Sequence, residues 1–150
     1  MIAAQSLVNN HVVKMVLESA QLLSTAHRVL DEFVPEHFYK TTHINHPCSK
    51  WTRESIENYW WLVEHFRGLL DEYTFRYGKK HKCESLFFDL QNPPFNLKEF
   101  DRTPFVCAMP DEYKISDDPV INYRNYYNKG KKHLFKWSVR EIPSWIVLDN

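Results

Sequence analysis

Residues 9–23, NNHVVKMVLESAQLL, carry the pattern that most restricts how this chain can fold. With residues placed ~100° apart on a helix, six polar side chains of this region fall within an arc of roughly 100°. This polar strip consists of His11, Lys14, Glu18, Gln21, Thr25 and Arg28. Apolar side chains fill most of the remaining circle, whereas an ordinary surface helix has a wide polar face. The pattern therefore predicts a central helix that is packed on most sides and shows one polar strip to a groove.

Apolar spacing predicts two long helices. The first runs over about residues 6–33 and ends before Pro35, which cannot continue a helix. The second runs over about residues 49–78, because apolar residues alternate at spacings of three and four along it. Gly78 suits the left-handed position that follows a helix end. Two long helices with apolar faces of this kind are expected to pack on each other.

Two shorter helices are expected in the second half of the chain. One covers about residues 82–90, and the other runs over about residues 119–133. Asp118 is a good N-cap for the latter helix, and Pro119 suits its first position. Between them, residues 92–116 contain four prolines and are expected to form an irregular loop.

These elements predict an all-α fold: residues 1–150 form a single helical domain, a compact bundle of two long helices plus shorter ones, with a proline-rich loop. A length of 150 residues suits one domain with a proper core, and three glycines are too few for a turn-rich β-sandwich or a Rossmann-like sheet. The tail over residues 136–150 is expected to form a turn or short strand that packs Trp137 and Trp145 on the body.

The cysteines and the hydropathy indicate a cytoplasmic protein. There are three cysteines at wide spacings, which is typical of a reduced intracellular chain rather than of a disulfide scaffold. No segment approaches the ~18 apolar residues of a membrane helix, and the first residues lack the pattern of a signal peptide. We therefore expect no contact with a membrane.

The charge is balanced overall but unevenly distributed. The net charge is zero, so nothing in the total indicates nucleic-acid binding. Residues 119–140, however, contain no acidic residue and six basic ones: Arg124, Lys129, Lys131, Lys132, Lys136 and Arg140. A second basic group consists of Arg76, Lys79, Lys80 and Lys82. Two interpretations stay open, a solvated charged surface and a surface that binds a phosphate backbone.

Glu18 is the residue of the polar strip that is the best candidate for a chemical role. One interpretation is a surface ion pair with Lys14, one helical turn earlier, worth a few tenths of a kcal/mol. The other is a carboxylate in a partly desolvated groove, where neighbouring cations tune it for acid–base or electrostatic work. The narrowness of the strip favours the second, because its flanking apolar residues imply burial.

The segment THINHPCSKW, residues 42–51, offers His43, His46 and Cys48 close together before the second long helix. A zinc site is the less favoured interpretation, because no CxxC or HExxH pattern accompanies them. A turn that caps the helix, or a polar cluster facing the Glu18 groove, is favoured instead. The chain also lacks a glycine-rich phosphate loop and a GxSxG motif. We therefore expect no metal and no cofactor.

At this point the sequence resembles a known family. The first-helix pattern, with a histidine seven residues before a glutamate, and the segment NHPCSKWTRESIENYWWLVEHFRGLLDEYTFRYG are similar to the phage-type pyrimidine dimer DNA glycosylases. The similarity covers roughly residues 9–78. It implies a compact helical enzyme that flips or kinks DNA at a damaged pyrimidine.

The resemblance also implies a chemistry. In the family, an N-terminal α-amino group attacks the sugar C1′ to form a Schiff base, and a helix glutamate, matched here by Glu18, supports the cationic sugar and the later strand cleavage. His11 matches a family histidine on the same face. The amine would be that of Met1, because Ile2 is too bulky for ready removal of the methionine. The arginines that flank the family glutamate are replaced by Leu17 and Gln21.

We therefore predict a DNA repair glycosylase and AP lyase with DNA as its partner, acting in the host cytoplasm if the gene is viral. Its catalytic residues would be Glu18 and Met1. Its DNA-binding residues would be His11, Lys14, Gln21, Arg28, His43, Asn45, His46, Lys50, Trp51, Arg124, Lys131 and Lys132. The alternatives are a non-catalytic nucleic-acid-binding phage accessory protein and an enzyme or binder of a free nucleotide. The lesion and the oligomeric state stay open.

Overall fold

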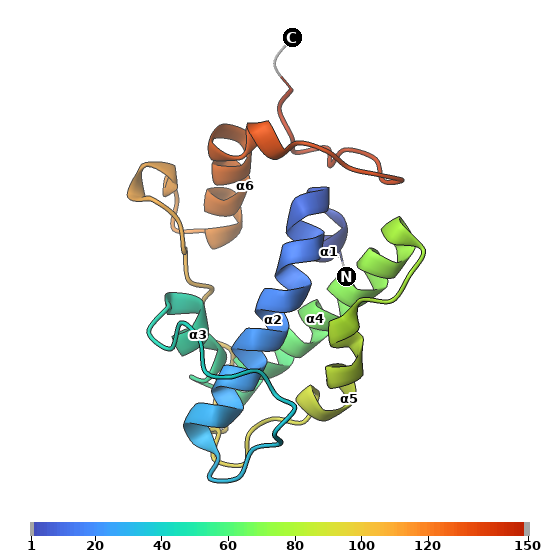
Figure 1. Cartoon of the computed structure of the whole chain (residues 1–150). Helices are drawn as coiled ribbons and strands as arrows, with labels where there is room; N and C mark the ends of the chain where they lie inside the picture. Colours follow the sequence, from blue (N-terminus) through green and yellow to red (C-terminus); the bar gives the residue numbers. More distant parts are fainter. Residues whose placement is uncertain (1, 149–150) are drawn as a thin grey trace.

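Two helices of 22 residues, α2 (Asn9–Leu30) and α4 (Ile56–Tyr77), pack against each other at the centre of the molecule (Figure 1). The computed structural model describes residues 2–148. The other helices are α1 (Ile2–Gln5), α3 (Pro47–Thr52), α5 (Phe87–Leu90) and α6 (Pro119–Gly130). Three short 3-10 turns complete the list: η1 (Lys82–Leu86), η2 (Asp111–Tyr113) and η3 (Lys132–Leu134). No strand occurs among residues 2–148, so the predicted all-α class is confirmed.

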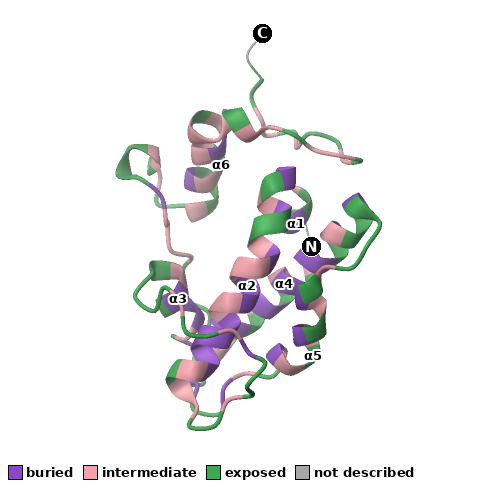
Figure 2. Ribbon diagram, viewed as in Figure 1, coloured by how far each residue is buried: buried purple, intermediate pink, exposed green. Residues whose placement is uncertain are grey.

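The core lies between α2 and α4, where their buried faces meet (Figure 2). The side chains with no or almost no exposure include Val16, Ala20 and Leu23 of α2 and Tyr59, Phe66, Leu69 and Leu70 of α4. Burying one large aliphatic or aromatic side chain contributes about 1.5–3 kcal/mol to folding. Their spacings are four and three positions along α2 and seven, three and one along α4, which places them on one face of each helix, as the apolar periodicity predicted.

The first long helix is shorter than predicted at both ends. Of the predicted range of residues 6–33, α2 covers residues 9–30. The short helix α1 lies before this range, and Val8, directly before α2, is extended. The chain turns there because Asn9 is held from outside the helix: its main-chain N–H donates to the Lys136 carbonyl (2.8 Å) and its amide donates to Ser138 (2.8 Å). At the other end, Asp31 adopts an extended conformation and caps the last turn.

The prediction of one helix over residues 49–78 was wrong, because α3 and α4 are separated at residues 53–55. Ser55 is extended, and its hydroxyl accepts a hydrogen bond from the main-chain N–H of Asn58 (3.2 Å) as an N-cap. The Asn58 amide in turn donates to the Trp51 carbonyl at the end of α3 (2.8 Å). These bonds satisfy the helix ends at the break, so the interruption leaves few polar groups unpaired.

The other predicted helix ends are confirmed in part. Gly78 adopts the left-handed conformation (φ 65°) and ends α4. Asp118 is the N-cap of α6 and accepts from the Val120 N–H at 2.8 Å, but α6 ends at Gly130 rather than near residue 133. The expected helix over residues 82–90 is η1 followed by α5.

The tail after α6 returns to the start of α2 and the end of α4 (Figure 1). The indole N–H of Trp137 donates to the Ser6 carbonyl (3.1 Å), and Trp145 packs edge-on against Tyr127 with ring centroids 5.8 Å apart. Residues 136–148 contain turns and no strand. The expected packing of both tryptophans on the body is therefore confirmed, with a turn rather than a strand.

Candidate active site

Side chains of the polar strip of α2 make hydrogen bonds to α6 and to the loop after α2, both of which lie beside this helix (Figure 1). The C-terminal part of the strip is covered by main chain. Thr25 is fully buried and bonds the main-chain N–H of Thr42 (3.2 Å), and Arg28 donates to the carbonyls of Phe38 (2.7 Å) and Tyr39 (2.6 Å). The part that stays partly open runs from His11 to Gln21. The N-terminal half of the strip is therefore the more open half, while the groove predicted along it remains a prediction.

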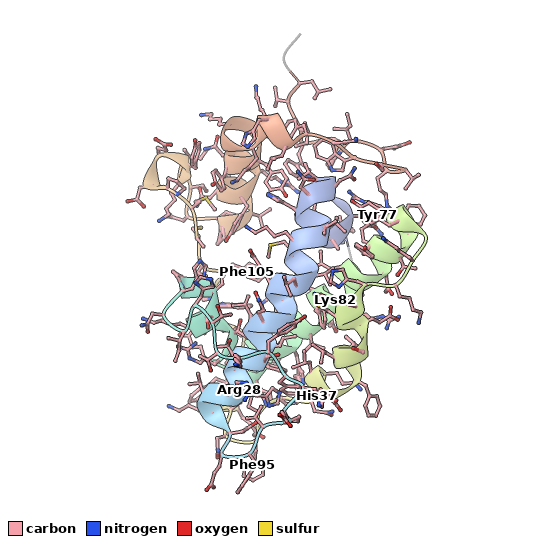
Figure 3. The ribbon with its side chains drawn as sticks, in the orientation of Figure 1. Arg28, His37, Tyr77, Lys82, Phe95 and Phe105 are labelled. Carbon is pink, nitrogen blue, oxygen red and sulfur yellow. The ribbon has the colours of Figure 1, made fainter. Side chains whose placement is uncertain are left out.

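Figure 3 shows how side chains fill the space around α2, with Arg28 directed from the helix into the loop beside it. The guanidinium of Arg28 has two carbonyl partners in that loop, so its first function is to hold residues 38–39 on α2. Its assignment to DNA remains a prediction.

Glu18 lies at the centre of the open part of the strip. Its carboxylate is 3.1 Å from the Nζ of Lys14, and the two side chains are 38% and 66% exposed. The pKa of the Cys48 thiol on α3 is raised, first by burial and second by the negative charge of Glu18. The thiol is therefore close enough to this carboxylate to interact with it electrostatically. The ion pair with Lys14 that the sequence suggested is therefore present, and Glu18 is half-buried; the interpretation as a groove carboxylate stays a prediction.

His11, two turns before Glu18, is joined to α6. Its Nδ1 is hydrogen-bonded to the hydroxyl of Tyr127, and the two rings meet edge-to-face with centroids 5.4 Å apart. Burial, followed by the charges of Lys131 and Lys14, lowers the pKa of His11. His11 is therefore a neutral imidazole at neutral pH, held between two helices.

Positive charge gathers around His11 from two directions. Lys14 comes from α2 itself, while Lys131 and His133 come from the residues that follow α6 and also lower the pKa of His11. The Nζ of Lys131 lies 4.8 Å from the centre of the Tyr126 ring. An anionic group such as a phosphate would relieve the repulsion among these side chains.

The loop residues predicted for the site are near α3, and their side chains are mostly exposed. His46 caps α3, where its Nδ1 accepts from the N–H of Cys48 (3.2 Å). His43 is exposed and adopts a left-handed conformation (φ 45°), and Asn45 and Lys50 are exposed. Within residues 2–148, no hydrogen bond or ion pair links the side chains of His43 or Asn45 to α2.

Among residues 2–148, neither Trp51 nor Arg124 has a hydrogen bond or ion pair to Glu18. Trp51 is buried, and its ring packs on Trp61 and Phe105 with centroids 5.8 and 5.5 Å apart. Arg124 is exposed on α6 and its guanidinium lies over the Trp145 ring at 5.5 Å. Lys132 is half-buried in η3, close in sequence to Lys131. The structure thus gathers His11, Lys14, Glu18 and Lys131, while Trp51 belongs to the packing of the fold.

Two surface hollows lie elsewhere. One, of about 530 Å³, is lined by Arg28, Val34, Glu36, Lys40 and Thr41. The other, of about 470 Å³, is lined by Glu57, Trp60, Trp61, Glu64 and Arg102. Neither includes Glu18. In the described part of the chain, no three His, Cys, Asp or Glu side chains are grouped so that they could hold a metal ion, and no helix has the length and hydropathy that crossing a membrane requires.

Sequence reasoning missed two features of this region. Tyr127 was not recognised as a partner of His11, because 116 residues separate them and no local pattern connects distant helices. Cys48 was considered only as a metal ligand or a turn residue. The basic, acid-free composition of residues 119–140 was the one sequence property that indicated a functional surface there.

Comparison with known proteins gives this site a family context. A family model described as pyrimidine dimer DNA glycosylase matches residues 2–85, which contain α1 to α4 and both His11 and Glu18. Comparison with curated proteins and with solved structures found no match. Because the family match covers more than half of the 150 residues, the chain belongs to the pyrimidine dimer DNA glycosylase family.

Proposed function

We propose that the protein is a DNA glycosylase and AP lyase that acts on damaged pyrimidines in duplex DNA, with Glu18 in its catalytic site. The observation that carries this proposal is the state of Glu18: a half-buried carboxylate on the central helix, with one exposed lysine as its ion-pair partner. Such a carboxylate can turn toward a cationic sugar without leaving a buried charge unpaired.

The proposed reaction uses an amine and this carboxylate. The amine attacks C1′ of the damaged nucleotide, the glycosidic bond breaks with its electrons leaving on the base, and the nitrogen loses a proton. The C1′–O4′ bond then breaks, its electrons and a proton go to O4′, and the open sugar carries the C1′=N Schiff base. A proton is then removed from C2′ and the C3′–O bond breaks, which cleaves the strand. Glu18 would stabilise the positive charge at C1′ in both steps. Met1, the predicted source of the amine, lies outside the described residues, and its role stays a prediction.

The proposed DNA contacts come from both halves of the chain. Leu17 and Gln21 stand where the family has arginines, so we infer that cations from other elements bind the phosphates instead. Lys14 of α2 and Lys131 after α6 are the best supported, because both act electrostatically on His11 between them. Lys132, Arg124, Lys50 and the exposed loop residues 43–46 extend the predicted surface.

Borohydride trapping tests the proposal. The protein is incubated with ultraviolet-irradiated and with abasic duplex DNA in the presence of borohydride, which reduces a Schiff base to a stable adduct. We expect an adduct with the wild type and at least about a hundredfold slower trapping with Glu18→Gln. Glu64→Gln, which removes an exposed carboxylate on α4, is the matched control and should trap at the wild-type rate.

Equal trapping by wild type and Glu18→Gln would remove Glu18 from the mechanism. Salt-dependent DNA binding without any adduct would favour the non-catalytic binding protein, an alternative supported by the replacement of the family arginines with Leu17 and Gln21. Absence of both adduct and DNA binding, with thermal stabilisation by a nucleotide, would favour a protein that acts on free nucleotides.

A further inference from the structure

Tyr127 joins a part of the chain outside the family match to the helix that carries Glu18. Its hydroxyl bonds the Nδ1 of His11 across 116 residues of sequence, and its side chain is 8% exposed. The family match ends at residue 85, whereas Tyr127 lies in α6. The Trp145 ring packs edge-on against the Tyr127 ring, with centroids 5.8 Å apart. Tyr127 is therefore a fixed group rather than a surface residue that meets His11 by chance.

The proton states of the two groups allow Tyr127 to donate this hydrogen bond. Burial raises the pKa of Tyr127 far above neutrality, so its hydroxyl keeps its proton and can donate. Burial lowers the pKa of His11, as do the charges of Lys131 and Lys14, so the imidazole is neutral. A neutral imidazole has one N–H. With the Tyr127 hydroxyl as the donor, Nδ1 accepts and the imidazole proton sits on Nε2.

Nε2 is the nitrogen that remains available to a ligand. No hydrogen bond from another residue among 2–148 reaches it, since the partner found for His11 is Tyr127 at Nδ1. The titratable and charged groups that act on His11 are Lys14 and Glu18 on its own helix, Lys131 after α6 and His133 in η3, besides Tyr127 itself. His11 and Glu18 are seven residues apart on one strip, a separation of ~10 Å along the helix.

We propose that Tyr127 is a positioning residue: by donating to Nδ1 it fixes His11 as the Nε2–H tautomer, so that His11 presents a neutral hydrogen-bond donor to a phosphate or sugar oxygen of the DNA bound beside Glu18. This inference rests on the proposed function for the identity of the ligand. It makes α6 part of the same site as α2, although α6 lies outside the family match.

The tautomer is measured without any activity. Two-dimensional ¹H–¹⁵N correlation of the histidine rings at neutral pH should show His11 as the Nε2–H form in the wild type. Tyr127→Phe removes the hydroxyl and keeps the ring, and we expect mixed tautomers and titration of His11 at a higher pH, because a donor to the unprotonated nitrogen stabilises the neutral form. Tyr126→Phe, one residue away on α6, should leave the His11 signals unchanged.

The functional consequence is measured with abasic duplex DNA. At pH 8, Tyr127→Phe should weaken binding about three- to tenfold, the effect of one hydrogen bond. At low pH both ring nitrogens of His11 carry protons, so the tautomer no longer matters and the two proteins should converge. A thermal melt of Tyr127→Phe confirms that the variant is folded.

Two results would overturn the inference: an unchanged His11 tautomer in Tyr127→Phe, or a binding loss of the same size at every pH. These readouts are separate from the test of the proposed function. If the wild type gives no borohydride adduct, the enzyme proposal fails, while the tautomer and the binding of abasic duplex still decide whether Tyr127 positions His11.

Discussion

Glu18 and Glu72 are two glutamates on the two central helices, and their surroundings are opposite. Glu72 is 2% exposed and accepts hydrogen bonds from Arg76 (2.6 Å) and from Arg140 (2.8 and 3.0 Å). Glu18 is 38% exposed and has Lys14 at 3.1 Å. A carboxylate whose oxygens are all bound to fixed guanidinium groups has nothing left for a ligand. The comparison separates a glutamate that holds the fold from one that keeps part of its carboxylate open to solvent.

The Glu72 cluster connects three parts of the chain. Arg76 also donates to the side chain of Asn9 (3.0 Å) and to the Gln5 carbonyl (3.0 Å), while Arg140 lies over the Phe75 ring at 4.0 Å. The N-terminal turn, α4 and the tail thus meet at one buried ion pair network. Burial alone would raise the pKa of Glu72, but the hydrogen bonds from Arg140 and Arg76 bring it below its usual value.

The largest effect is expected for Glu72→Gln. Removing this charge leaves two guanidinium groups uncompensated around a buried position, and we expect a loss of about 3 kcal/mol or more in the free energy of unfolding. Urea denaturation measures it. Glu18→Gln is the matched control and should change the free energy of unfolding by less than about 0.5 kcal/mol, because an exposed pair contributes little. Equal losses in the two variants would contradict the comparison.

Acid should destabilise the protein in two successive ranges of pH. Burial lowers the pKa of His65 to about 4, so the unfolded chain takes up this proton near pH 6.5 and the folded chain only near pH 4. Stability that is present above pH 6.5 is therefore lost as the pH falls toward 4, by about 3 kcal/mol in total. Glu72, with its lowered pKa, adds a further loss below about pH 4.5, where the unfolded carboxylate is protonated first.

Urea denaturation between pH 7 and pH 4 separates the two groups. His65→Gln should flatten the decline above about pH 4.5 and leave the decline at lower pH in place. The Glu18→Gln variant should follow the wild-type curve throughout. An unchanged slope in His65→Gln between pH 6.5 and 4.5 would show that His65 titrates normally in the folded protein.

The smallest effects are expected for the cations beside Glu18. Lys14→Ala and Lys131→Ala should each lower DNA affinity by a few-fold and reduce the slope of log affinity against log salt by about 1, since each removes one proposed phosphate contact. Stability should change by less than about 0.5 kcal/mol for Lys14→Ala. Fluorescence anisotropy with a labelled duplex at several salt concentrations measures both quantities. Lys79 is exposed in the loop directly after α4, and Lys79→Ala is the control, which should keep the wild-type slope.

The features that the sequence predicted are local ones. Gly78 and Asp118 end and begin helices for reasons that lie within a few residues, and the apolar spacing of α2 identified its buried face. The break before α4 also had a local indication, since Ser55 precedes an apolar run as an N-cap would. The residues before it, such as Trp51 and Thr52, are also compatible with a helix, so one continuous helix was predicted and the interruption was missed.

The features that could not be predicted from local sequence patterns are mostly contacts between distant segments. Glu72 and Arg76 lie four residues apart on the apolar face of α4, three and seven positions after Leu69, so their burial as a pair could have been inferred from the helix period. The contribution of Arg140 could not, because it depends on where the tail returns. The same holds for Tyr127 and His11, and with them for the part of the candidate site that α6 supplies.

The return of the tail to the start of α2 has a consequence for how the protein reaches its active form. The bond between Asn9 and Ser138 spans 129 residues and that between His11 and Tyr127 spans 116. Contacts of such sequence separation form late and slow the folding of a helical chain, whose other contacts are mostly local. The helices α2 and α4 can therefore associate during synthesis while the surroundings of His11 are still incomplete. During refolding, the ability to bind DNA should therefore appear in a separate, slower kinetic phase that follows the gain of helical structure.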